Sequence, residues 1–155
     1  MPTLQMKPKQ LNILLADDDV DDCLFFKKVV KELHPNSNLT ILSDGEQLMS
    51  YLFENSNQLA DVLFLDLNMP RKNGFECLTE IKADSTLKDF PVVMFSTSYP
   101  RDKNYEQDLI NMLNKIGSYG FIRKHNDLKE LKLEIQNVLM KITKSGPLNQ
   151  QGERL

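Results

Sequence analysis

The sequence predicts an α/β protein built on a doubly wound, five-stranded parallel sheet with five helices. Short continuous apolar runs, such as 62–65 and 92–95, alternate with longer stretches in which apolar residues recur every three or four positions. Continuous apolar runs are typical of parallel strands covered on both faces, and the wider spacing is typical of amphipathic helices. Because a helix separates each strand from the next, right-handed parallel crossovers are the favoured connections.

The composition is that of one ordinary globular domain, with 155 residues, 41% of them hydrophobic, and a net charge of −3. This slight acidity argues against a nucleic-acid partner. No stretch is as long and apolar as a membrane span, and the first residues lack the apolar core of a signal peptide, so we expect a cytoplasmic protein. Cys23 and Cys77 have no metal-binding or redox spacing, which indicates reduced core residues.

The predicted strands and helices divide the chain into three parts. Residues 1–10 contain lysines and prolines without apolar periodicity, and we expect a flexible N-terminal arm. Residues 11–143 hold every predicted element and form the domain. Residues 144–155 contain nothing to bury and are expected to form a disordered C-terminal tail.

The first half of the domain reads as strand, helix, strand, helix. Strands are predicted at 11–16 and 39–42, and turn residues at 34–37 separate the first helix from the second strand. Asp19 is suited to cap the first helix, and Asp44-Gly45 leads into the second. The inward face of the first helix is expected to hold Cys23, Phe26, Val30 and Leu33.

The second half repeats this alternation. A strand at 62–65 is followed by a loop in which Gly74 is expected to permit a close backbone approach or a positive φ. A helix at about 75–82, a polar connection at 83–90, a strand at 91–95 and an edge strand at 119–123 come next. A helix at 105–116, ended by Gly117, is expected to bury Leu109, Met112, Leu113 and Ile116. The last helix, from 127, should present Leu128, Leu131, Ile135, Val138 and Ile142 on one face.

Carboxylates follow two of the predicted strands. Asp17 and Asp18 come after the first strand, and Asp66 comes after the third. A flavodoxin-like strand order of 2-1-3-4-5 makes these strands neighbours and brings the three carboxylates together at the end where such sheets bind ligands. Repulsion then requires either a proton or a cation among them, and oxygen ligands favour Mg²⁺. The alternative is that Asp66 merely starts a loop.

With these elements in place, residues 11–143 resemble the receiver domain of two-component response regulators, of the single-domain, CheY-like kind. The resemblance rests on four motifs at strand ends: 15–18, 65–70 with Gly74, 96–97 and 121–124. It implies that Asp66 accepts a phosphoryl group from the phosphohistidine of a kinase. It also implies that Asp17, Asp18, Asp66 and the backbone carbonyl of Asn68 hold Mg²⁺.

The resemblance assigns further roles at the fourth and fifth strands. Lys124 and the Ser96 hydroxyl, with Thr97 beside it, would neutralise charge on the phosphoryl oxygens. A switch is implied in which Ser96 moves towards the phosphoryl group and the Phe121 ring changes rotamer. Core packing is the alternative role for Phe121, and a solvated surface cation is the alternative for Lys124.

Three features depart from the pattern of the family. Thr97 stands where a small alanine is usual and is expected to narrow access to the site. His125 stands where proline usually follows the lysine, so we expect a trans Lys124–His125 bond, with the cis bond that the family usually has as the alternative. Ser96 and Lys124 are 28 positions apart, several more than usual, which places an insertion within 99–118.

The resemblance implies a phosphorelay signalling protein without an output domain, and not an enzyme with an external substrate. Its partners would be a sensor histidine kinase or phosphotransfer protein and a downstream protein, without nucleic acid or membrane, as a monomer or weak homodimer. An aspartate-nucleophile phosphatase is a second hypothesis, although the stretch 66–70 lacks the second carboxylate and the threonine of that class. A receiver-like scaffold that binds without phosphorylation is the third.

Overall fold

The computed structural model describes residues 10–97, 103–124 and 127–144, so most of the predicted arm and tail lie outside the described residues. A five-stranded parallel sheet forms its centre, in the order β2-β1-β3-β4-β5. This confirms the predicted fold and strand order. The strands are β1 (Asn12–Ala16), β2 (Asn38–Leu42), β3 (Val62–Leu65), β4 (Val92–Thr97) and β5 (Gly120–Lys124).

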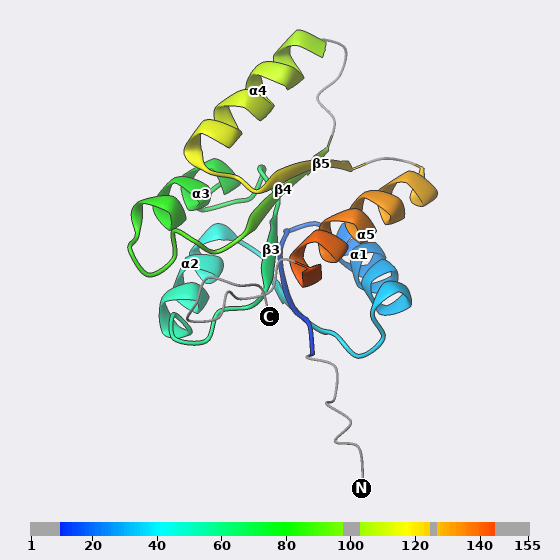
Figure 1. Ribbon diagram of the computed structural model, residues 1–155. Helices are drawn as coiled ribbons and strands as arrows, with labels where there is room; N and C mark the ends of the chain where they lie inside the picture. Colours follow the sequence, from blue (N-terminus) through cyan, green and yellow to red (C-terminus); the bar gives the residue numbers. More distant parts are fainter. Residues whose placement is uncertain (1–9, 98–102, 125–126, 145–155) are drawn as a thin grey trace, which may run out of the picture.

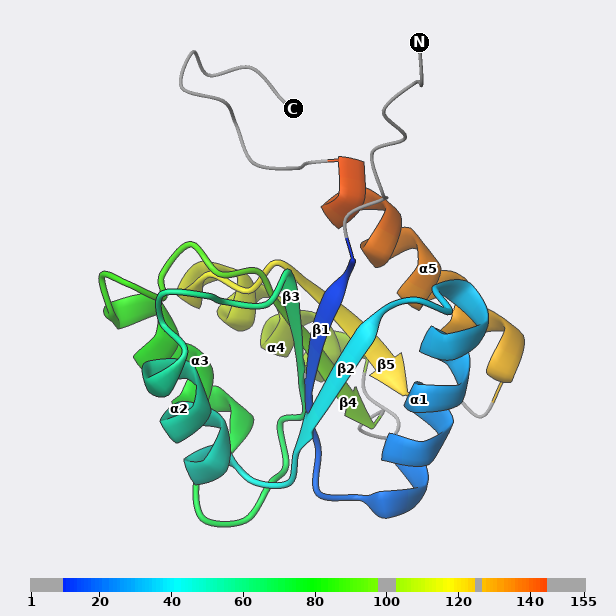
Figure 2. The same ribbon diagram turned by 90° about the horizontal axis from the view of Figure 1, so that it is seen from below.

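Helices cover both faces of the sheet. Figures 1 and 2 show α1 and α5 on one face and α2 and α3 on the other, with α4 on the same side as α3. The helices are α1 (Val20–Leu33), α2 (Gly45–Glu54), α3 (Gly74–Ala83), α4 (Lys103–Ile116) and α5 (Leu128–Lys144). Each face has its own apolar core, one beneath α1 and α5 and the other beneath α2, α3 and α4. In the described part of the chain, no helix has the length and apolarity needed to cross a membrane.

Capping side chains mark the start of the first three helices. Asp19 and Asp44 cap α1 and α2 by accepting hydrogen bonds from the backbone N–H groups of Asp22 and Gln47. Asn73 caps α3 through a capping box with Glu76. These caps satisfy backbone donors that would otherwise lack partners, and they hold the helix starts at the edge where the strands end.

Three details of the predicted core are wrong. Met112 of α4 is 44% exposed and Leu128 of α5 is 57% exposed. Leu128 is the first residue of α5, and Leu131, Ile135 and Leu139 form the buried stripe of that helix. The connection at 83–90 is not simply polar, because Leu87 and Phe90 in it are buried against the core beneath α2 and α3.

Gly74 was predicted to permit either a close backbone approach or a positive φ, and the close approach is confirmed. A Cβ atom there would lie 2.1 Å from the carbonyl oxygen of Asp66, so the backbones approach too closely for a side chain. The positive φ in this loop belongs to Arg71, at 67°. Gly117, which ends α4 as predicted, has a φ of 124°.

Candidate functional site

The sheet register brings the ends of β1 and β3 together. Ala16 pairs with Leu65, and the N–H of Asp66 donates to the carbonyl oxygen of Ala16 over 2.9 Å. The next residue on each strand is an aspartate, Asp17 on one and Asp66 on the other. Topology alone therefore sets these two side chains next to each other at the carboxyl edge of the sheet.

Three carboxylates meet at this edge. Carboxylate oxygens of Asp17, Asp18 and Asp66 lie within 4.8 Å of one another. Asp17 and Asp66 are buried, whereas Asp18 is exposed. Backbone donors orient the buried pair: the N–H of Asp19 lies 2.9 Å from Asp17 Oδ1, and the N–H of Asn68 lies 3.3 Å from Asp66 Oδ1.

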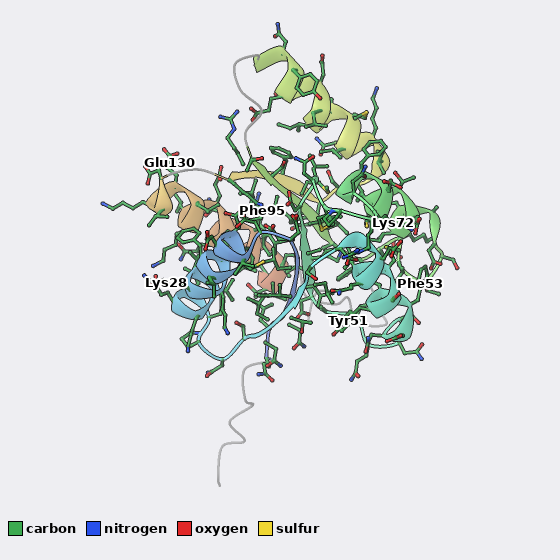
Figure 3. All side chains as sticks on the ribbon, turned by 180° about the vertical axis from the view of Figure 1, so that it is seen from behind. Lys28, Tyr51, Phe53, Lys72, Phe95 and Glu130 are labelled. Carbon is green, nitrogen blue, oxygen red and sulfur yellow. The ribbon has the colours of Figure 1, made fainter. Side chains whose placement is uncertain are left out.

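Lys124 reaches the same carboxylates from β5. Its Nζ lies 2.6 Å from Asp17 Oδ2, 3.0 Å from Asp22 Oδ2 and 3.5 Å from Asp66 Oδ2. It also lies 5.2 Å from the centre of the Phe95 ring, which Figure 3 shows beside α1. The ammonium is therefore desolvated and surrounded by negative charge on the α1 side of the sheet.

Burial and charge shift the pKa values of these groups. Burial raises the pKa of Asp66 to about 7, although the Lys124 charge opposes this and Asp17 adds to it. Burial acts to lower the pKa of Lys124, but the hydrogen bond to Asp17 and the charges of Asp66 and Asp17 outweigh it and raise that pKa. Lys124 therefore stays positively charged, and further positive charge near Asp66 would favour its ionised form.

A cavity of about 410 Å³ opens onto this cluster. Asp66, Asn68, Lys124 and the hydroxyl residue Thr97 all line it, together with Asp18, Asp19, Val20, Asp21 and Asp22. Thr97 pairs with Lys124 in the sheet register, at the ends of their strands. Thr97 is thus an exposed residue of the cavity lining, and that it narrows access stays a prediction.

Ser96 and Phe121, the two predicted switch residues, are not among the described residues that line the cavity. Ser96 is fully buried, and its hydroxyl donates to the carbonyl oxygen of Thr97 over 3.4 Å. Phe121 is partly buried against the core beneath α2, α3 and α4. The neighbouring Arg123 points to the same side and forms an ion pair with Glu106 of α4. The Ser96 hydroxyl is therefore held by the backbone of its own strand, and the Phe121 ring packs against the core.

The loop after Asp66 is packed tightly against α2 and α3. Besides the close approach at Gly74, a Cβ atom at Gly45 would lie 2.0 Å from the carbonyl oxygen of Lys72. Arg71 Nε lies 2.9 Å from Asp44 Oδ2, which ties the loop to the cap of α2. Figure 3 shows Lys72 between α2 and α3, where it pairs with Glu80. These contacts fix the backbone that follows the buried aspartate.

The donor set of the cluster fits a hard divalent cation. Asp17, Asp18 and Asp66 offer carboxylate oxygens at short mutual distances, and an open cavity leaves room for water ligands. The backbone carbonyl of Asn68, in the loop lining the cavity, is the fourth ligand that the resemblance implies. One ammonium faces several carboxylates here, so a bound cation would relieve their repulsion.

Comparison with known proteins identifies the family. The family model described as "Response regulator receiver domain" matches residues 13–136. The chain belongs to this family. Receiver domains are signalling proteins that are typically phosphorylated on an aspartate, bind Mg²⁺ and interact with histidine kinases and downstream targets. The resemblance carried by the four strand-end motifs is thus confirmed.

Several relatives share the receiver domain of this chain. The response regulator Rcp1 of Synechocystis sp. is 33% identical over 136 residues, which cover 81% of this chain and 84% of that protein. The 3′,5′-cyclic-nucleotide phosphodiesterase regA of Dictyostelium discoideum is 30% identical over 138 residues, 89% of this chain but 16% of that protein. The similarity to the phosphodiesterase is therefore limited to a receiver domain.

Solved receiver structures have the same fold. The phosphorylated cyanobacterial phytochrome response regulator RcpA matches with a TM-score of 0.75 and 28% identity, covering 90% of this chain and 98% of that one. The Mn²⁺-bound form of response regulator Rcp1 matches with a TM-score of 0.73 and 29% identity, covering 90% and 99%.

One close contact was not predicted from the sequence, and one prediction falls outside the described residues. Asp22 pairs with Lys124, although no role was predicted for Asp22. Its position four residues after Asp18, in the first turn of α1, was the available signal, because one helical turn returns to the same edge. His125, and with it the predicted trans bond, lies outside the described residues.

Proposed function

We propose that Asp66 is the phosphoacceptor of this receiver domain. The observation that supports this most is its place at the end of β3, buried yet open to the cavity, with Lys124 Nζ 3.5 Å from its Oδ2. Asp18 is exposed and Asp17 already holds Lys124 at 2.6 Å, so neither combines burial with a free approach in the same way. An in-line nucleophile needs that approach.

In the proposed reaction, an Asp66 carboxylate oxygen attacks the phosphorus of a phosphohistidine. The new O–P bond forms as the P–N bond breaks, and the electron pair stays with the leaving imidazole. Lys124 would then contact a phosphoryl oxygen, while the Ser96 hydroxyl turns from the Thr97 carbonyl towards the phosphoryl group. Phe121 would follow into the space that Ser96 leaves, which carries the change towards α4.

Asp17, Asp18, Asp66 and the Asn68 carbonyl would hold Mg²⁺, which supplies charge neutralisation at the phosphoryl oxygens when bound. Burial raises the pKa of Asp66 to about 7, so added positive charge also favours the ionised nucleophile. The protein would act without turnover of an external substrate, apart from its own phosphorylation and dephosphorylation. We further propose that it works in the cytoplasm and signals by binding a downstream protein.

The phosphoryl donor would be a sensor histidine kinase or a phosphotransfer protein. RcpA, the solved receiver with a TM-score of 0.75, is a phytochrome response regulator. A phytochrome with histidine kinase activity is therefore a specific donor to test.

The assignment is tested by incubating the protein with a small phosphodonor and Mg²⁺ and recording its intact mass. We expect one phosphoryl adduct on the parent, none on Asp66→Asn, and none on the parent when the metal is chelated. Asp21→Asn removes the same charge from the same cavity wall and should be labelled like the parent. Labelling of Asp66→Asn at the parental rate would show that another carboxylate is the nucleophile, and turnover of the donor without an adduct would favour a phosphatase.

A further inference from the structure

The shortest contacts of the Lys124 ammonium are not to Asp66, the aspartate that we assign as the phosphoacceptor. Its two shorter contacts are to Asp17, at 2.6 Å, and to Asp22, at 3.0 Å, and the contact to Asp66 is longer, at 3.5 Å. Asp22 lies in the first turn of α1, where its own N–H donates to the capping carboxylate of Asp19 over 2.9 Å. The start of α1 therefore offers Lys124 a carboxylate besides those of Asp17 and Asp66.

We propose that Asp22 is a positioning residue that draws the Lys124 ammonium away from Asp66 and so weakens the hold of the site on a phosphoryl group. This inference rests on the proposed function of Asp66. The carboxylates whose oxygens cluster closely enough to share a metal are Asp17, Asp18 and Asp66, and Asp22 is not among them in the described chain. Its effect is thus exerted on the cation and not on the metal.

The two partners of Lys124 differ in how readily they release it. Asp17 has a fully buried side chain, and loss of its cation would leave a buried charge unpaired. The Asp22 side chain is 38% exposed, so water replaces the lost contact at a small cost. When a phosphoryl group on Asp66 attracts the ammonium, Asp22 is the partner that is given up. The cost of that exchange reduces the affinity of the site for the phosphoryl group.

The test uses beryllium trifluoride, a phosphoryl mimic, titrated into the full chain with saturating Mg²⁺ and followed by calorimetry. Asp22→Asn should bind the mimic about three- to fivefold more tightly than the parent, which is the upper part of the range expected for loss of a partly exposed ion pair. Asp21→Asn is the matched control, because it removes the same charge from the same turn and cavity wall. It should stay within about twofold of the parent.

Two further measurements separate positioning from a general structural effect. Asp22→Glu restores the carboxylate and should return the affinity towards the parental value. The affinity for Mg²⁺ alone should be the same in Asp22→Asn and Asp21→Asn, because Asp22 acts on Lys124.

The inference is overturned if Asp22→Asn binds the mimic no more tightly than Asp21→Asn, if Asp22→Glu binds as tightly as Asp22→Asn, or if Asp22→Asn alone changes the Mg²⁺ affinity. If the parent itself binds no mimic in Mg²⁺, the proposed function fails and this inference fails with it. Binding by the parent together with equal affinities of the two asparagine variants would overturn the role of Asp22 alone.

Discussion

Helices α3 and α4 lie on the same side of the sheet, yet they are attached to it very differently. Each follows a strand that ends at the site, β3 with Asp66 and β4 with Ser96 and Thr97. The 10-residue α3 buries four residues: Gly74, Cys77, Leu78 and Ile81. The 14-residue α4 buries Leu113 among its described side chains, and in Figure 1 it extends beyond the rest of the molecule.

This difference suggests separate roles for the part of the site at Asp66 and the part at Ser96 and Thr97. The backbone around Asp66 is fixed by close packing against α2 and α3, which suits a nucleophile that must keep its geometry. Among the contacts of α4 in the described residues are one fully buried leucine, the partly buried Leu109 and Ile116, and the Arg123–Glu106 ion pair. Elements with few buried contacts move at low cost, so a change at Ser96 and Phe121 would be transmitted through α4.

The largest expected effect comes from the close approach on the α3 side. Gly74→Ala would place a Cβ atom 2.1 Å from the Asp66 carbonyl oxygen and 2.9 Å from Leu67 Cα, and both neighbours are backbone. We expect a loss of about 4 kcal/mol or more in unfolding free energy, measured by urea titration, together with loss of phosphorylation. In a helix, alanine is favoured over glycine by about 1 kcal/mol. A loss of unfolding free energy in Gly74→Ala would therefore be caused by the steric contact and not by helix propensity.

Gly120→Ala is the control on the α4 side. No atom lies within 4 Å of a Cβ atom built at this strand residue. We expect a change within about 0.5 kcal/mol of the parent. Equal losses in the two alanine variants would mean that the backbone at Asp66 is no more constrained than the start of β5.

The second comparison sets a core residue of α3 against an outward residue of α4. Ile81→Ala removes a fully buried side chain and should cost about 3 kcal/mol, whereas Met112→Ala removes one that is 44% exposed and should cost less than about 0.5 kcal/mol. The measurement is again unfolding by urea. A cost at Met112 as large as that at Ile81 would show that α4 packs as firmly as α3.

The sequence predicts the strand order and the residues at the strand ends better than it predicts contacts between elements. Strand order and the meeting of Asp17, Asp18 and Asp66 were predictable, because period and topology decide which residues end parallel strands at one edge. Lys124 was expected beside them from the resemblance to receiver domains. Met112 was assigned inward because a helical stripe has two flanks, and the packing of neighbouring elements decides which flank is buried. Contacts from one element to another, such as Arg71 to Asp44, depend on how a loop packs against a helix and leave no periodic signal.

The third prediction concerns the rigid half of the site in the absence of metal. Burial raises the pKa of Asp66 from 3.8 to about 7 in the folded protein. Between these values the folded state binds more protons than the unfolded state, so its stability falls as the pH rises through this window. Asp66→Asn lacks the titrating group. The stability of the parent relative to Asp66→Asn should therefore fall by on the order of 2 kcal/mol, because water in the cavity screens part of the full effect.

The measurement is urea unfolding of both proteins in the presence of a metal chelator at about pH 4.5 and about pH 7.5. These two pH values span most of the range between the two pKa values of Asp66. Addition of Mg²⁺ at the higher pH should restore the relative stability of the parent. A difference that does not change with pH would mean that Asp66 is ionised throughout and that burial does not dominate its pKa.

The smallest expected effect separates backbone strain from charge in the loop that fixes Asp66. Arg71 has a φ of 67°, which an arginine adopts at a cost, and its Nε lies 2.9 Å from Asp44 Oδ2. Arg71→Ala loses the ion pair and keeps the strained backbone, whereas Arg71→Gly loses the ion pair and relieves the strain. The glycine variant should therefore melt roughly 2–4 °C above the alanine variant, as expected for about 1 kcal/mol in a domain of this size. Both variants should melt below the parent if the contact with Asp44 stabilises the loop. Identical melting temperatures of the two variants would show that the conformation at residue 71 is not strained, and the rigidity of the loop would then rest on the packing at Gly45 and Gly74 alone.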